Sequence, residues 1–343
     1  MAGYRDKFIK SFNFIASCMP TKLLIQLSQQ KLIVPVYHII SDEKVPHIKH
    51  LYTIKNTNQF KKDLDFLLKN YYPISYPDFQ ELILKGEKPK KNSFILTFDD
   101  GLREFCDVIA PILLQKGIPA INFLNSDFID NKDLFFRYKV SLLIEEISKE
   151  ETVLKNKEIQ NWFNQFPKSS NYKKTLREIH YHNKGLLDEL ATILQIDFHT
   201  FLSEKKPYLS SDQIIDLQKK GFHFGAHSVD HPEYRFLDLQ EQIRQIKDCI
   251  ICLEKSKLLT NKIFAFPFTD YGVSKHFFQD VLETNKIVDI TFGSAGLKKD
   301  ISPFHIQRIP FETSNLSAKQ ILNSELIYYI VKSFLNKNTI TRH

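Results

Sequence analysis

Residues 93–101 read SFILTFDDG and contain the most informative pattern of the sequence. A short run of apolar and β-branched residues, typical of a buried parallel strand, ends in Asp99, Asp100 and Gly101. Successive strand residues point to opposite faces, so the two carboxylates can share a site only if the chain turns there, which a glycine permits. Two ionised carboxylates in a desolvated site repel each other unless a cation or a proton lies beside them. The stretch therefore predicts a metal site or acid–base chemistry.

Residues 221–232 read GFHFGAHSVDHP and supply further candidate ligands. His227 and His231 are four residues apart, a spacing that brings two imidazoles to one side of a helical turn or a tight loop. One carboxylate and two imidazoles form a three-ligand set with room for water. Such a set is expected of a catalytic metal site rather than of a closed structural one.

The order of TFDDG, HSxxH and a third strand ending in Phe-Pro-Phe resembles the polysaccharide deacetylases, carbohydrate esterase family 4, also called the NodB-homology domain. The similarity covers about residues 33–312, apart from an insertion. The resemblance implies a distorted (β/α) barrel that hydrolyses an N-acetyl or similar small N-acyl group of an amino sugar. It also implies that Asp100, His227 and His231 bind a divalent metal, most often Zn²⁺, and that Asp99 acts as general base.

The third motif departs from the pattern of that family. Many members have Arg-x-Pro-Tyr, whose arginine orients the catalytic aspartate, whereas residues 265–268 read AFPF here. We expect Arg308, in HIQRIP, to orient Asp99 instead; the alternative is a structural arginine at the surface. The resemblance further implies that the metal and a backbone N–H after Pro267, that of Phe268, stabilise the oxyanion.

The sequence leaves the general acid open. Many members use a late histidine near the end of a strand, but His305 lies near the start of its strand, and we expect it to be non-catalytic. The remaining candidates are metal-bound water, protonated Asp99 and His38. His38 is near the end of the first predicted strand, residues 31–40, where barrels have their active sites, although a buried structural histidine fits equally well.

Apolar periodicity predicts alternating strands and helices on both sides of these motifs, including a helix over 57–70 and strands over 263–268 and 304–309. A strand over 94–98, a helix over 102–117 and a strand over 120–124 form a βαβ unit. This pattern alone fits an α/β barrel or a doubly wound sheet. From about 130 to 207 the chain favours helices and has no strand signal, which predicts a helical insertion that could cover the site.

Composition indicates one globular domain with an insertion. The chain has 343 residues, of which 43% are hydrophobic and 25% charged. We divide it into a basic amphipathic segment (1–30), the barrel (31–315) and a C-terminal helix (316–343). The formal charge of +7 could favour an anionic partner, although a generally Lys-rich composition accounts for it as well. No arginine-rich stripe with interleaved aromatic residues is present, so we expect no nucleic-acid binding.

The first residues resemble a signal peptide only superficially. Arg5, Lys7 and Lys10 precede an apolar run over 12–19 that is short, interrupted by polar residues and without a clear cleavage site. We expect an amphipathic helix, either packed on the domain or in peripheral contact with the inner face of a membrane. The expected location is cytoplasmic, with export not excluded.

Three functions are consistent with the sequence. The leading one is metal-dependent N-deacetylation of an amino sugar in a cell-envelope glycan or its lipid-linked or nucleotide-linked precursor. The second is deformylation or another N-deacylation of a lipid-linked sugar. The third is a catalytically inactive barrel that binds glycans, which the altered third motif favours. The free-energy cost of burying several carboxylates and imidazoles together without a cation argues against this third function.

Overall fold

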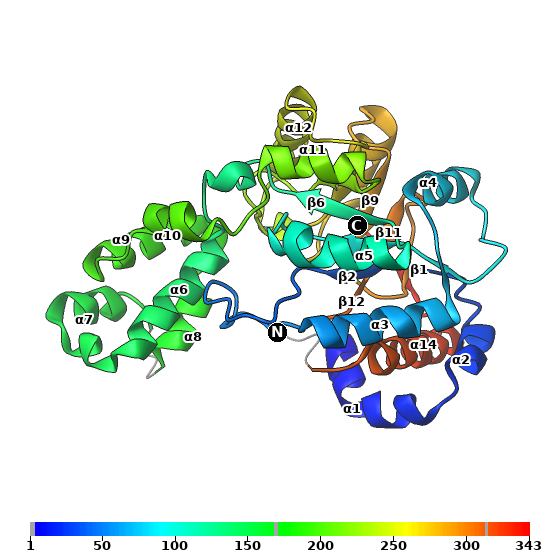
Figure 1. The fold of residues 1–343 in the computed structure, drawn as a ribbon, viewed down its shortest axis with the longest axis horizontal. Coiled ribbons are helices and arrows are strands. Elements are labelled where there is room, and N and C mark those ends of the chain that lie inside the picture. The colour runs from blue at the N-terminus through cyan, green and yellow to red at the C-terminus, as the bar shows by residue number, and fades with distance from the viewer. Residues whose placement is uncertain (1–3, 168–170, 313–314) are drawn as a thin grey trace.

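A computed structural model of the protein, which describes residues 4–167, 171–312 and 315–343, has a parallel barrel at its centre (Figure 1). The barrel strands are β2 (Pro35–Tyr37), β5 (Leu96–Phe98), β6 (Ala120–Leu124), β7 (His223–Ala226), β8 (Ile263–Ala265), β9 (Ile290–Gly293), β11 (His305–Gln307) and β12 (Ile309–Pro310). Their order in the sheet is β11-β9-β8-β7-β6-β5-β2-β12, and every pairing is parallel. The fold is therefore the predicted distorted (β/α) barrel and not a doubly wound sheet.

One passage of chain closes the barrel. The strand predicted over 304–309 is divided in two, because β11 pairs with β9 and the directly following β12 pairs with β2 at the opposite edge. His305 lies opposite Thr291, and Ile309 lies opposite Pro35. Arg308 is the single residue between the two segments and thus lies at the seam of the barrel.

The barrel interior is filled by apolar side chains and closed at one end by α4 (Tyr76–Lys85). The ring of Phe79 stacks 5.8 Å from that of Phe292, and Tyr76 contacts His223 at the amino end of β7. On β7 only a glycine fits at position 225, because a Cβ there would lie 2.6 Å from Ile263. The packed interior leaves the carboxyl ends of the strands for a site.

Helices on the outside cover the barrel with their apolar faces. They are α3 (Thr57–Asn70), α5 (Ala110–Lys116), which continues a π-helical turn, α11 (Ser211–Lys219), α12 (Leu239–Lys255) and α13 (Lys275–Gln279). Two small parallel sheets flank the barrel: one joins β1 (Leu32–Ile33), β3 (Tyr72–Pro73) and β4 (Ser93–Phe94), and the other joins β10 (Lys299–Asp300) and β13 (Thr339–Ile340).

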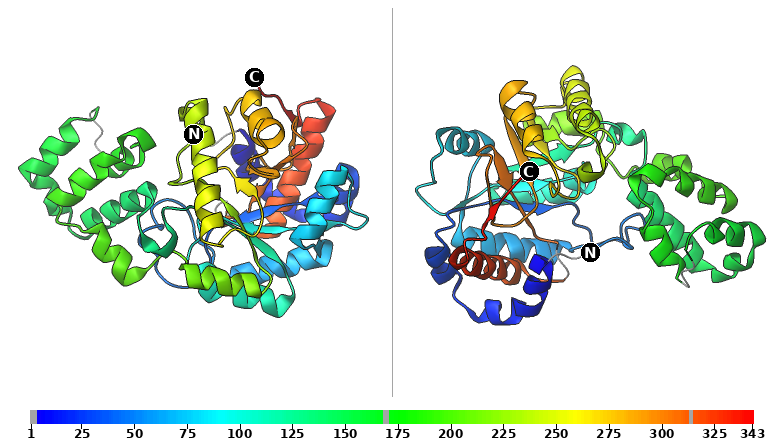
Figure 2. Two further views of the ribbon diagram at one scale, coloured as in Figure 1. Left: turned by 90° about the horizontal axis from the view of Figure 1, so that it is seen from above. Right: turned by 180° about the vertical axis from the view of Figure 1, so that it is seen from behind.

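The predicted insertion forms a helical lobe beside the barrel (Figures 1 and 2). It contains α6 (Phe136–Lys149), α7 (Lys157–Asn164), α8 (Tyr172–Arg177), α9 (Gly185–Ile193) and α10 (Phe198–Lys205). The lobe has its own apolar core, which includes Trp162 and extends to Ile39, Val45 and Ile48 of the loop after β2. Because the insertion leaves the barrel after β6 and returns before β7, it starts at the carboxyl ends of the strands. Residues 168–170 of the predicted insertion lie outside the described residues.

The two ends of the chain pack on each other along one flank of the barrel (Figure 1). Helices α1 (Tyr4–Cys18) and α2 (Thr21–Ser28) contact α14 (Ala318–Phe334). Asn323 Nδ2 donates to the carbonyls of Ala16 (2.9 Å) and Met19 (3.0 Å), and Arg5 forms an ion pair with the buried Glu325. The predicted amphipathic segment is thus packed on the domain, with residues 1–3 outside the described residues. None of the helices in the described ranges has the length and apolar character needed to cross a membrane.

Candidate active site

The two adjacent aspartates reach one site because the chain turns sharply after β5. Asp100 has a φ of 72° and Gly101 a φ of 61°, so the turn begins one residue before the glycine. Left-handed backbone is costly for a residue with a Cβ and is found mainly where the surroundings enforce it. Asp99 and Asp100 are both 4% exposed. The structure thus buries two carboxylates at the carboxyl end of a central strand.

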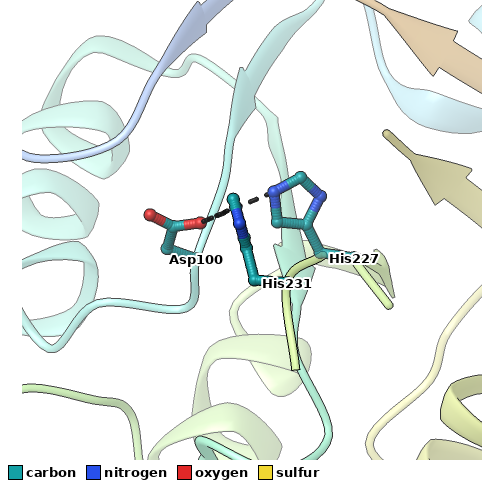
Figure 3. Close-up of side chains that lie close together, drawn as sticks. All are labelled: Asp100, His227 and His231. Carbon is teal, nitrogen blue, oxygen red and sulfur yellow. Dashed lines mark ion pairs between the residues drawn. The ribbon is translucent and has the colours of Figure 1, made fainter. Parts of the chain in front are cut away.

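Three of the predicted ligands converge (Figure 3). Asp100 Oδ1 lies 3.2 Å from His231 Nε2 and 3.5 Å from His227 Nε2, and all three side chains are buried. Within the described part of the chain, Asp100 Oδ1 has no hydrogen-bond partner. A buried carboxylate oxygen without a partner, facing two imidazole nitrogens, fits a divalent cation, and this donor set suits zinc. The residues present therefore fit the implied metal.

The surroundings of the two histidines fix their orientation. His227 Nδ1 lies 2.8 Å from the carbonyl oxygen of Ala265, which can only accept, so Nδ1 carries a proton and Nε2 is the nitrogen that faces Asp100. Burial lowers the pKa of His231, which keeps that imidazole neutral near pH 7. The ring of His231 is held between Phe135 and Phe268, with ring centroids 4.2 and 4.7 Å away. Both imidazoles are thus prepared to act as ligands.

The insertion contributes a residue to this site that sequence reasoning missed. The hydroxyl of Tyr138, on α6, donates to Asp100 Oδ2 at 2.8 Å, and Tyr138 is fully buried. The hydrogen bond fixes the carboxylate with Oδ1 directed at the histidines. No local pattern marks Tyr138 in the sequence, because its role depends on how α6 docks against the barrel.

The second carboxylate is held by Arg308. Its Nη1 donates to Asp99 Oδ1 at 2.6 Å and its Nη2 to Asp99 Oδ2 at 2.8 Å, while Nε donates to the carbonyl of Gly293. Arg308 is 1% exposed, which is incompatible with the alternative of a surface arginine. Burial acts to raise the pKa of Asp99, but the charge and hydrogen bonds of Arg308, together with the nearby His227 and His38, lower it overall. Asp99 is therefore ionised and fixed, and its Oδ2 lies 3.9 Å from His227 Nε2.

His38 lies directly after β2 and pairs with a carboxylate that the sequence did not reveal. Its Nδ1 is 2.7 Å from Glu312 Oε2, and the same carboxylate accepts the backbone N–H groups of His38 and Ile39 at 2.9 Å. Burial acts to lower the pKa of His38, but the hydrogen bond and charge of Glu312 raise it to about 9. His38 is thus a half-buried cation near neutral pH rather than a buried neutral histidine.

The loop after β8 brings the predicted oxyanion group to the ligands. The strand predicted over 263–268 ends at Ala265, and after Pro267 the backbone of Phe268 turns to a φ of 55°. Among the described residues we find no acceptor for the N–H of Phe268. The ring of Phe268 is 41% exposed and lies against His231. This N–H is therefore available to a bound group beside the predicted metal ligands.

His305 belongs to a separate buried network. Its Nδ1 lies 2.8 Å from Thr291 Oγ1, and its Nε2 lies 3.1 Å from Asp270 Oδ2. Asp270, Asp300 and His305 could hold a cation by distance alone, but the guanidinium of Arg342 pairs with both carboxylates, at 2.6 Å for Asp300. We interpret this network as an ion-pair cluster that ties the C-terminus to the barrel.

A parallel barrel with an Asp-Asp pair and two histidines at the carboxyl ends of its strands is the arrangement of a carbohydrate deacetylase. The chain belongs to the polysaccharide deacetylase family, whose family model matches residues 86–279, more than half of the sequence. A search among curated protein sequences finds no match.

Solved structures share the fold at low sequence identity. The deacetylase PplD of Streptococcus pyogenes, solved with acetate, is 16% identical with a TM-score of 0.55 over 86% of this chain and 97% of that chain. IcaB of Ammonifex degensii is 12% identical, with a TM-score of 0.51 over 86% and 97%. The polysaccharide deacetylase BC0361 of Bacillus cereus is 15% identical, with a TM-score of 0.50 over 86% and 68%. At these identities the similarity establishes the fold alone.

Proposed function

We propose that this protein is a metal-dependent carbohydrate N-deacetylase. Its substrate would be an N-acetylated amino sugar of a cell-envelope glycan, or of the lipid-linked or nucleotide-linked precursor. The observation that carries the proposal is the buried Arg308–Asp99 pair beside the cluster of Asp100, His227 and His231. An arginine from the barrel seam supplies the contact that the altered third motif lacks, which argues against an inactive barrel.

Asp100, His227 and His231 would hold the metal, and we propose Zn²⁺ because the donor set is one carboxylate and two imidazoles. When bound, such an ion lowers the pKa of a water molecule and polarises the amide carbonyl. Tyr138 and the carbonyl of Ala265 orient the donor atoms from outside this set.

The remaining residues would move protons and stabilise charge. Asp99, ionised and held at both oxygens, takes a proton from the attacking water as the C–O bond forms. The N–H of Phe268 donates to the oxyanion that develops on the carbonyl oxygen. His38 is protonated near neutral pH and gives its proton to the sugar nitrogen as the C–N bond breaks. The products are acetate and a free amine.

Substitution of Asp99 tests these roles. Asp99→Asn keeps the shape of the side chain and can still accept one hydrogen bond from Arg308 through its Oδ1, but it cannot take up the proton. We expect this variant to bind the metal like the wild type and to release no amine from N-acetylated amino-sugar oligosaccharides. Metal analysis and amine release would be measured on the same samples. Wild-type turnover in Asp99→Asn, or no turnover in metal-loaded wild type on glycans and lipid-linked precursors, would contradict the proposal.

A further inference from the structure

Helix α1 exposes several of its large apolar side chains to solvent. Tyr4, Phe14 and Ile15 are 89%, 75% and 58% exposed, and Phe12 is 43% exposed. The inward face instead buries the smaller Ile9 and Ala16. At 3.6 residues per turn, Tyr4 and Ile15 are separated by only about 20° around the helix axis, so they share the outward face. Phe8 contacts Tyr328 of α14, so the helix carries apolar side chains both toward the protein and in solvent.

Helix α14 contacts both α1 and α2 (Figures 1 and 2), and α2 and α14 carry further exposed apolar residues. Leu23 and Leu27 of α2 are exposed, and so are three residues at the end of α14 and directly after it. Leu27 and Phe334 line the same surface cavity, together with Tyr329 and Ile330, so the apolar surface continues from α2 to α14. We call this surface the apolar flank; it consists of Tyr4, Phe12, Phe14, Ile15, Leu23, Leu27, Val331, Phe334 and Leu335.

The apolar flank concentrates the exposed apolar side chains of the molecule. It holds half of the large hydrophobic residues that are exposed in the described part of the chain, although these helices are a small fraction of it. Single exposed apolar residues are normal on protein surfaces, but a concentration of them on neighbouring helices marks an interaction surface.

The exposed charges on the flank helices are mostly positive. On residues 4–31 they are lysines, including Lys7, Lys10 and Lys22, apart from Asp6, whose side chain is 39% exposed. The carboxylate of Asp6 lies 3.5 Å from Arg5, and that of Glu325 is buried against the same arginine. The described residues from 318 onward add exposed lysines and no exposed carboxylate. Aromatic and aliphatic side chains bordered by lysines are the composition of helices that lie in the interface of an anionic membrane.

We propose that the apolar flank docks on the surface of a membrane that contains anionic phospholipids, with α1 lying in the plane of the interface. The lysines contact lipid headgroups, and the aromatic rings enter the boundary with the acyl chains. This docking is independent of the proposed deacetylation. If both hold, docking positions the barrel next to lipid-linked amino sugars; this consequence rests on the proposed function.

Vesicle flotation tests the proposal directly. Full-length protein would be mixed with vesicles of phosphatidylcholine alone or of phosphatidylcholine with phosphatidylglycerol. We expect it to float with the anionic vesicles, and added salt should weaken this binding. Lys7→Glu and Lys10→Glu should each lower the partition coefficient by at least about fivefold, the effect expected for one lysine near an anionic surface. The double variant Phe14→Asn/Ile15→Asn should not float.

Matched control variants distinguish the role of the apolar flank from the general effect of removing an exposed apolar side chain or reversing a surface charge. Leu84→Asn removes an exposed apolar residue on α4, and Lys88→Glu reverses an exposed charge elsewhere; both should float like the wild type. Circular dichroism and melting temperature would verify that every variant is folded. Wild type that stays in solution with both vesicle types, or flank variants that float as it does, would overturn the proposal. So would a wild-type dimer that the double variant converts to a monomer without any lipid binding, which would assign the flank to a second copy.

Discussion

At the scale of single residues, the site concentrates unusual backbone conformations. Asp100, Ser228, His231 and Phe268 have φ values of 72°, 74°, 64° and 55°. Each such conformation in a non-glycine residue costs on the order of 1 kcal/mol, and its persistence requires support from the surroundings. The support is visible at Ser228, whose Oγ accepts from the N–H of His231 at 3.0 Å. These turns bring ligands from separate segments to one point.

Replacing Arg308 by lysine tests the orientation of Asp99. An ammonium cannot donate to both carboxylate oxygens in the planar geometry of a guanidinium, so Arg308→Lys should leave Asp99 paired but poorly oriented. We expect turnover to fall about a hundredfold, the effect of a small misplacement of a reacting group, with metal content unchanged. Arg244→Lys, at a surface pair with Glu241, is the control. Wild-type turnover in Arg308→Lys would show that Asp99 needs no such clamp.

The pairing of His38 with Glu312 predicts a specific pH dependence. A general acid works in its protonated form, so turnover should fall as the pH rises through the His38 pKa of about 9. Glu312→Gln removes the negative charge that raises this pKa, so the alkaline limb of the profile should move to lower pH. The acid limb should stay in place. An alkaline limb at the same pH in both proteins would exclude His38 as the acid.

The sequence predicts the site residues that belong to local motifs. It does not predict those whose role depends on how distant segments pack together. Asp99, Asp100, His227 and His231 each follow a recognisable strand. Arg308 was predicted only because the third motif lacks its arginine. Glu312 and Tyr138 carry no local signal, since one pairs across the barrel seam and the other comes from the insertion.

At the scale of elements, the helices were easier to predict than the strands. The helix predicted over 57–70 has those bounds, with a capping box from Asn56 and Gln59 at its start. The strands predicted over 31–40 and 304–309 are each divided in the structure. Apolar periodicity continues through a residue at which a strand changes its partner, so it cannot mark the division.

Helix α6 brings Tyr138 of the insertion to the site. A conservative substitution can measure how much this residue contributes to metal binding. Tyr138→Phe removes only the hydroxyl that donates to Asp100. We expect metal affinity to fall about 10- to 100-fold, as is typical when a partner of a ligand is lost. Competition with a chelator would measure it without reference to turnover.

Tyr181→Phe is the matched control, because that hydroxyl, also in the insertion, donates to Asp230 instead. Equal metal affinity of Tyr138→Phe and wild type would show that the insertion does not support the ligands.

At the scale of the whole molecule, the sequence predicted the class of fold but not how its parts assemble. The order of strands and helices, with the family resemblance, led to the barrel. Closure by β11 and β12, the position of the helical lobe and the packing of α1 and α2 on α14 depend on contacts between distant segments. The division of the chain at residues 30 and 315 stays a prediction.

The most direct test of the account is the metal content of the purified protein after incubation with Zn²⁺. The wild type should hold about one divalent ion per chain, and Asp100→Ala and His231→Ala should hold none. His199→Ala, at an exposed histidine of the insertion, should match the wild type. A wild type without bound metal, or ligand variants that keep it, would contradict the proposed site and the hydrolase mechanism built on it.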